Sequence, residues 1–298
     1  IVGAGLQDDS AWDIAGEIDI HLENTWQTAN MTDLVWKRYG EESQYILFMY
    51  EEPYPFGLPF GAKVEFVQDL RSGEYVYTNS SAAFSLQLGR KGKWYFGGGK
   101  ETITPTDLGD SLGIQHFKAQ TFNIEYYGEG RNDRWLPSTG YFWDAKTQIG
   151  QVKENNKNDN IIIRLQLHLE QFLSLSRNMS LRFKLWSGIV WDDGQEIHVG
   201  QKIRYGGINT LRGYQEDIFA NGIINITSLD LLFTPNEHFQ LFAFGDKAYQ
   251  DVYDIPLSLG FGLRQRTENY VMEVSFGWPV DEAFSGGKVH VKFTSLLN

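Results

Sequence analysis

The sequence predicts an all-β protein in which about 16 antiparallel strands form a barrel that crosses a membrane. Three observations support this prediction. Aromatic residues make up 15% of the chain, 31 glycines stand beside only 8 prolines, and apolar and polar residues alternate along many segments. Aromatic residues favour strands, glycines suit tight turns, and alternation with a period of two places successive side chains on opposite faces of a sheet.

The clearest alternation lies in residues 160–174. One face carries Ile161, Ile163, Leu165, Leu167 and Leu169, and the other carries Arg164, Gln166, His168 and Glu170. A soluble sheet on an apolar core and a barrel with lipid outside and a polar lumen both give this pattern. Several segments exceed the usual soluble strand and suit the roughly nine to eleven residues that cross a bilayer at a tilt. Tryptophans near strand ends fit interfacial girdles, so we expect the membrane barrel.

Turn signals divide the chain into about sixteen expected strands, an even number as single-chain bacterial barrels require. In chain order they cover residues 1–7, 11–23, 31–38, 43–51, 60–69, 75–89, 93–102, 114–128, 138–152, 160–174, 179–190, 222–234, 238–248, 257–267, 269–279 and 287–298. The first is short and holds Gly3 and Gly5, which weaken a strand interior. We expect it to form a weak seam with the last strand, which holds Phe293 and Leu297; a frayed terminus is the alternative.

Two connections are expected to be long, at about 103–113 and about 191–221. Loops of this size are usually functional or disordered. The second contains "RYGGINTLRGYQ", residues 204–215, whose apolar and aromatic content argues against disorder. No linker is visible, so residues 1–298 are expected to form a single barrel domain.

Composition excludes several classes of function. The net charge of -12 leaves no basic surface for phosphates, so no nucleic-acid partner is expected. The chain has no cysteine and no stretch of about 18 apolar residues, which excludes disulfides and helical membrane spans. Because common catalytic and phosphate-binding motifs are absent and the 6 histidines are scattered, we expect no enzyme activity, metal or cofactor.

Several motifs, taken in order, resemble the BamA/TamA superfamily (bacterial surface antigen family) of outer-membrane assembly and translocation barrels. The family carries Arg-Gly-Phe/Tyr at the tip of its long sixth extracellular loop, and "GGINTLRGY" lies between the eleventh and twelfth expected strands. The family's Phe-x-Asp-x-Gly motif on the thirteenth strand is similar to "FGDKA", residues 244–248, with Ala248 replacing the last glycine. Weaker similarities are "SLDLLFTP" at 228–235, "LPSTGYFWDAKTQIG" at 136–150 and "GKVHVKFTSLLN" at 287–298, which lacks the family's terminal aromatic.

The resemblance implies that this loop folds back into the lumen, where Arg212 meets an acidic partner. The alternation itself places Asp230 and Asp246 on inward faces of neighbouring strands, where one guanidinium can bind both. The expected loop latch comprises Arg212, Gly213, Tyr214, Asp230, Phe244 and Asp246. The alternative is that Arg212 and Asp246 are separate, solvated groups in the lumen.

The resemblance further implies a protein of the bacterial outer membrane that inserts or translocates client proteins without covalent chemistry. Expected partners are outer-membrane lipids, lipopolysaccharide and client proteins. Relatives typically carry POTRA domains, or a patatin-like lipase domain in one branch, and we expect none within residues 1–298. A non-translocating porin-like or structural barrel is the main alternative, and a soluble carbohydrate-binding β-sandwich is a remoter one.

Overall fold

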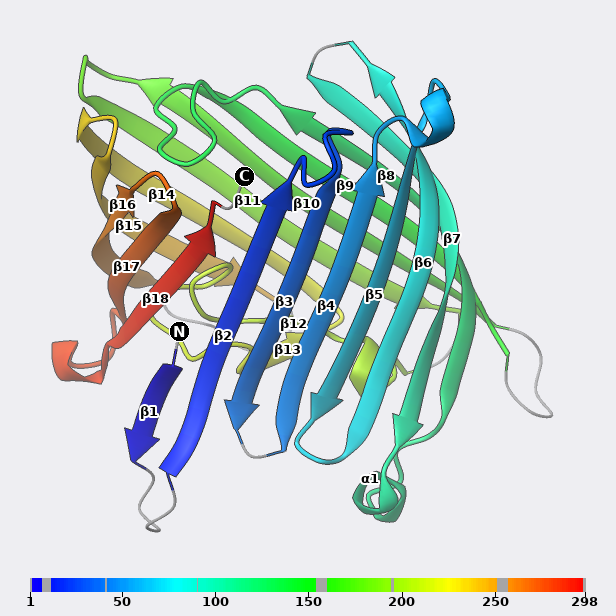
Figure 1. Ribbon diagram of the computed structural model, residues 1–298. Coiled ribbons are helices and arrows are strands. Elements are labelled where there is room, and N and C mark those ends of the chain that lie inside the picture. Colours follow the sequence, from blue (N-terminus) through cyan, green and yellow to red (C-terminus); the bar gives the residue numbers. More distant parts are fainter. Residues whose placement is uncertain are drawn as a thin grey trace.

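The computed structural model describes residues 2–6, 12–40, 42–89, 91–153, 160–193, 196–250 and 257–296. Sixteen strands within these ranges form one antiparallel sheet whose order follows the chain. The sheet curls into a barrel (Figure 1). None of the helices in the described ranges is long and apolar enough to cross a membrane.

The strands of the barrel closely match those expected from turn signals and alternation. They are β1 (Val2–Leu6), β2 (Trp12–Glu23), β3 (Met31–Gly40), β4 (Ser43–Glu52), β5 (Gly61–Arg71), β6 (Tyr75–Leu88), β7 (Gly92–Pro105), β8 (Phe117–Glu129), β9 (Gly140–Val152), β10 (Asn160–Ser174), β11 (Met179–Asp192), β14 (Ile223–Asn236), β15 (Phe239–Tyr249), β16 (Ser258–Arg266), β17 (Tyr270–Pro279) and β18 (Lys288–Ser295). The predicted fold class is therefore confirmed.

Alternation sorts the side chains of these strands into two faces. On β14, Leu229 and Leu231 are exposed on the outside of the barrel, whereas Asp230 between them is fully buried inside. On β15, Leu241 is exposed while Phe242 is buried. The outer face is thus apolar and suited to lipid, and polar groups turn to the lumen, as in membrane barrels.

Small elements interrupt the connections. The helix α1 (Asp107–Ser111) lies between β7 and β8, and the side chain of Thr106 caps it by accepting a hydrogen bond from the Gly109 amide at 3.2 Å. Single 3-10 turns are η1 (Pro55–Gly57), η2 (Val199–Gln201) and η3 (Phe284–Gly286). The long loop between β11 and β14, residues 193–222, contains a further pair of short strands, β12 (Ile203–Tyr205) and β13 (Phe219–Asn221), which sequence alternation did not predict.

Loop 193–222 turns into the barrel, and β12 and β13 lie inside it (Figure 1). It brings Ile203, Tyr205 and Leu211 into an apolar cluster with wall residues such as Ile103 and Ile224. Because these side chains are removed from water by the wall itself, the loop has its own small core within a polar lumen. Its position is therefore fixed by packing as well as by charge.

The ends of the sheet do not seal. β1 pairs only with β2, over Trp12 to Gly16, and β18 pairs only with β17 among the described residues. β18 comes close to β2 without a hydrogen-bonded ladder. Figure 1 shows β1 beside the lower part of β2 and β18 beside its upper part. The barrel is thus nearly closed, with an unsealed seam between its first and last strands.

Three of the four predicted seam residues, Gly3, Gly5 and Phe293, lie on the two strands that flank this seam. Gly3 and Gly5 are in β1, opposite Ala15 and Asp13 of β2. Phe293 is in β18, exposed on the outside and 5.9 Å from the ring of Tyr270. Leu297 lies outside the described residues.

Candidate functional site

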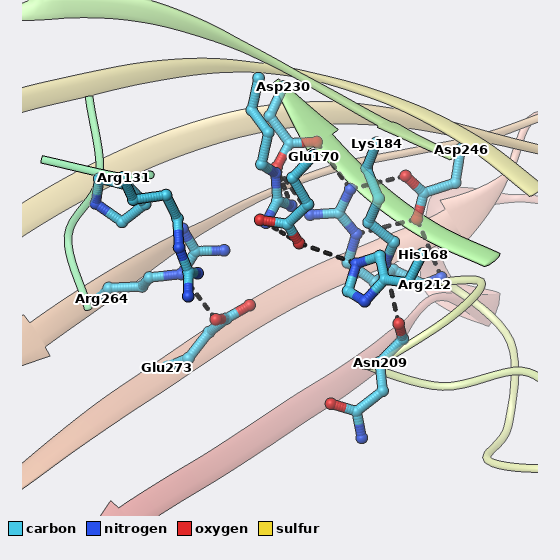
Figure 2. Close-up of polar contacts among 12 residues, drawn as sticks. Arg131, His168, Glu170, Lys184, Asn209, Arg212, Asp230, Asp246, Arg264 and Glu273 are labelled. Atoms are coloured by element: carbon cyan, nitrogen blue, oxygen red, sulfur yellow. Dashed lines mark hydrogen bonds and ion pairs between the residues drawn. The ribbon is translucent and has the colours of Figure 1, made fainter. Parts of the chain in front are cut away.

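The tip of loop 193–222 lies deep in the lumen, against the wall formed by β14 and β15. Arg212 at this tip is 1% exposed, and Asp230 and Asp246 are fully buried. Their strands are neighbours, and Asp230 and Asp246 both occupy inward positions of the shared ladder. Figure 2 shows the guanidinium of Arg212 between the two carboxylates.

Arg212 hydrogen-bonds both carboxylates at once. Its Nε and Nη2 donate to the two oxygens of Asp246 at 2.8 and 2.6 Å, and its backbone amide donates to the same carboxylate at 3.0 Å. Its Nη1 and Nη2 donate to Asp230 at 3.1 and 2.8 Å. Two bidentate pairs hold the planar guanidinium in one position, which a lysine ammonium would not do.

A second arginine shares this buried charge. Arg182 on β11 pairs with Asp230, which it faces directly in the β11 and β14 ladder. Burial alone would lower the pKa of Arg212, but Asp246 and Asp230 outweigh it and raise that pKa above its ordinary value. Two arginines thus balance two carboxylates, and buried charges of this kind are tolerated because each has its partner.

Aromatic rings cover one side of the arginine. The Cζ atom of Arg212 lies 3.6 Å from the ring centroid of Phe244 and 5.9 Å from that of Phe242, distances at which a cation is attracted to a ring face. The rings fit because β16 carries glycines opposite them. A Cβ added to Gly260 would come within 2.6 Å of Phe244 Cε1, and one added to Gly262 within 2.9 Å of Phe242 Cε2.

Gly213 lets the chain pass close to the wall after Arg212. Its φ of +89° belongs to the left-handed region, and an added Cβ would meet the backbone nitrogen of Trp278 at 3.0 Å. Its amide donates to His290 Nε2 at 3.3 Å. The ring of Tyr214 packs edge-on against Phe219, another residue of the loop, with centroids 5.3 Å apart. The aromatic ring beneath the guanidinium of Arg212 is therefore that of Phe244 and not that of Tyr214.

The loop also contacts the opposite wall through its stem. Gln201 is buried and donates to Glu101 on β7 at 3.3 Å, and it also bonds Arg164 on β10. Glu101 accepts further bonds from Arg164 at 2.9 Å and Gln148 at 2.8 Å. Nearer the loop's end, Asp217 accepts from Arg71 of β5 at 2.7 Å.

Residues of the loop line two cavities in the lumen, of about 660 and 280 Å³. Asn209 of the loop and Lys292 of β18 line both. Two acidic residues of β2 also face the lumen: Asp19 lines the larger cavity, and Glu23 pairs with His21 and Arg134. In the part of the chain that the structure describes, no group of three or more His, Asp or Glu side chains is placed to hold a metal ion.

Sequence reasoning did not include Arg182, Phe242 or the stem contacts in the site. Arg182 was recognisable in principle, because alternation puts it on the inward face of β11 and strand register puts it opposite Asp230. The stem contacts of Gln201 and Asp217 carry no such signal, because they join a loop to strands far away in the sequence.

A curled antiparallel sheet with an apolar outer face, a polar lumen and a loop bound inside it defines a transmembrane β-barrel of the outer-membrane class. The sequence matches the Omp85 superfamily domain over residues 32–246, a range that includes Arg212 and both aspartates. The chain therefore belongs to the Omp85 superfamily, whose barrels reside in the outer membrane of Gram-negative bacteria. The predicted family resemblance and localisation are confirmed.

Among the solved structures that share the fold are two bacterial proteins. One is BamA from Haemophilus ducreyi lacking POTRA domains 1-3, with a TM-score of 0.68, 13% identity, and coverage of 98% of this chain and 68% of that chain. The other is CdiB from Acinetobacter baumannii, with a TM-score of 0.61, 11% identity, and coverage of 96% and 56%. At such low identity the likeness concerns the fold alone. No curated protein matches the chain in sequence.

Proposed function

We propose that this chain acts in the insertion or translocation of client proteins at the outer membrane, without covalent chemistry. The observation that carries the proposal is the unsealed seam, at which β18 has no hydrogen-bonded partner beyond β17 among the described residues. An unpaired strand edge presents backbone donors and acceptors to which another extended chain can add. A porin-like barrel instead gains its stability from complete closure.

Each group of predicted residues has a role in this proposal. Gly3 and Gly5 weaken β1, and Phe293 lies on β18, where a client strand would pair; Leu297, also proposed for the seam, lies outside the described residues. Arg212 holds the loop in the lumen through Asp230, Asp246 and Phe244, Gly213 lets the loop tip approach the wall, and Tyr214 packs against Phe219 within the loop. The partners proposed are outer-membrane lipids, lipopolysaccharide and client proteins.

Depletion of the protein, combined with conductance measurements, tests the proposal. We expect depletion to reduce a restricted set of proteins in the outer membrane, measured by quantitative proteomics of that membrane. We also expect small single-channel conductance in planar bilayers, because the loop occupies the lumen. A large, steady conductance together with an unchanged outer-membrane proteome would favour the non-translocating barrel.

A reversible lock tests the seam directly. The chain has no cysteine, so Ile20→Cys on β2 and Phe293→Cys on β18 introduce the only two thiols. A cleavable bis-maleimide that joins them should abolish complementation of the depleted strain, and cleavage of the linker should restore it. Full complementation by the locked barrel would contradict the proposal.

A further inference from the structure

The loop between β8 and β9, residues 130–139, folds over the barrel mouth opposite the one through which loop 193–222 enters. It is longer than the other turns at that mouth. Because neighbouring strands alternate in direction, the ends of β2, β8 and β16 and the start of β15 all lie at this same mouth. Figure 1 shows the loop in green at the top of the barrel, folded toward the strands near the end of the chain.

On one side the loop is fixed to β15 and β16. The carboxylate of Asp133 accepts from Arg266, the last residue of β16, at 2.6 Å. The fully buried amide of Gln240 on β15 donates to the carbonyl of Pro137 at 3.1 Å. Buried hydrogen bonds of this kind are costly to leave unmade, so this side is the firm attachment of the loop.

Asp133 also shapes the loop itself. Its other carboxylate oxygen accepts the backbone amides of Trp135 and Leu136 at 2.8 and 2.9 Å. Burial alone would raise the pKa of Asp133, but the amides of Leu136 and Trp135, together with Arg266, outweigh it and lower that pKa. The carboxylate is therefore ionised at neutral pH and holds the turn and the ion pair together.

On the other side the loop reaches β2. Arg134, the next residue, pairs with Glu23, the last residue of β2, and its guanidinium lies 5.0 Å from the ring centroid of Trp135. The Trp135 ring meets His21 of β2 edge-on, with centroids 6.5 Å apart. The side chains of Arg134 and Glu23 are 40% and 46% exposed, so this contact is the weaker one.

Two consecutive residues, Asp133 and Arg134, therefore hold strands on opposite sides of the unsealed seam, since β16 precedes β17 and β18 while β2 follows β1. We propose that loop 130–139 is a strap that restrains the seam at this mouth, fixed to β15 and β16 and releasable from β2. This inference rests on the proposed function in one respect: the motion that the strap restrains is the sideways opening of the seam through which a client would pass.

Distances between spin labels across the seam test the strap. Phe66 on β5 and Phe261 on β16 face outward on either side of the seam, and Phe84 on β6 and Leu165 on β10 face outward on the continuous wall. Replacing each pair by cysteines in the otherwise cysteine-free chain allows nitroxide labelling of the full barrel in lipid nanodiscs. Pulsed electron spin resonance then gives the distance distribution of each pair.

The strap is released by Glu23→Gln or Arg134→Gln, and Glu237→Gln is the matched control. Glu237 is an exposed carboxylate at the same mouth, and its ion pair is with its neighbour His238. We expect either release variant to add a population in which the seam pair is longer by about one strand spacing, roughly 5 Å. The double variant should add nothing further, and the control variant should match the unmodified barrel.

Two outcomes overturn the strap: an unchanged seam distance in both release variants, or an equal broadening of the wall pair, which means general loosening. A longer seam distance with unchanged client insertion supports the strap and counts against the proposed function. The two proposals are thus distinguished, because the label distances do not depend on any client.

Discussion

Loop 193–222 is attached to the barrel wall at its tip and at its stem, and the two attachments distribute charge differently. At the tip, the loop supplies the cation Arg212 and the wall supplies the carboxylates of Asp230 and Asp246. At the buried stem contact, Glu101 and Arg164 on the wall already neutralise each other, and the loop adds only the amide of Gln201.

This difference decides what release of the loop costs at each place. Withdrawal of Gln201 leaves Glu101 paired with Arg164, so two hydrogen bonds are lost but no charge is left alone. Withdrawal of Arg212 leaves Asp230 with Arg182 but removes every hydrogen bond described above for Asp246. A buried charge without its partner is more costly than hydrogen bonds lost from an ion pair that stays intact, so the tip is the stronger attachment of the loop.

The largest expected effect is that of Arg212→Ala. Removing one partner of a buried ion pair costs about 3–5 kcal/mol, and here two carboxylates lose it. We expect the loop to leave the lumen, heat-modifiability on gel electrophoresis to change, and complementation to fail. Arg212→Lys, which keeps the charge without the planar fork, should lie in between. Wild-type heat-modifiability and complementation by Arg212→Ala would contradict the role of the latch.

A smaller effect is expected from Gln201→Ala at the buried stem. Gln201 bonds the charged groups Glu101 and Arg164, and the loss of a hydrogen bond to a charged group costs about 1.5–3 kcal/mol. The ion pair on the wall remains, so no charge is left without a partner. Limited proteolysis of loop 193–222 should detect more frequent opening of the stem while the tip stays protected. Destabilisation as large as that of Arg212→Ala would show that the two attachments are equivalent.

The smallest effect is expected from Asp217→Asn at the outer part of the stem. The side chains of Arg71 and Asp217 are 10% and 20% exposed, but Arg71 keeps Asp69 as a second carboxylate partner at 2.7 Å, so we expect a loss of about 1 kcal/mol or less. Urea unfolding in detergent micelles should show the difference at low salt and lose it at high salt, because ions screen exposed charges. An effect that persists at high salt would mean that burial makes this pair stronger than its exposure suggests.

Much of the barrel was predictable because alternation is a local property of the chain. It placed nearly every strand, and it put Asp230 and Asp246 on inward faces beside the proposed position of Arg212. It did not find α1 or the β12 and β13 hairpin, whose short segments hold too few residues for a period to be visible. It also gave no sign that residues 130–139 leave the wall, since a turn and a strap have similar polar sequences.

The sequence by itself determined where strands run, which side chains meet lipid, and that an arginine at a loop tip could meet two aspartates across neighbouring strands. Only the tertiary structure decided that Arg182 and Phe242 complete that site, that Gln201 reaches Glu101 on the far wall, and that the seam stays unsealed. The ion pairs of Asp133 with Arg266 and of Arg134 with Glu23 are likewise visible only in the tertiary structure. These contacts join residues far apart in the chain, and their proximity depends on how the whole sheet curls, which no local pattern encodes.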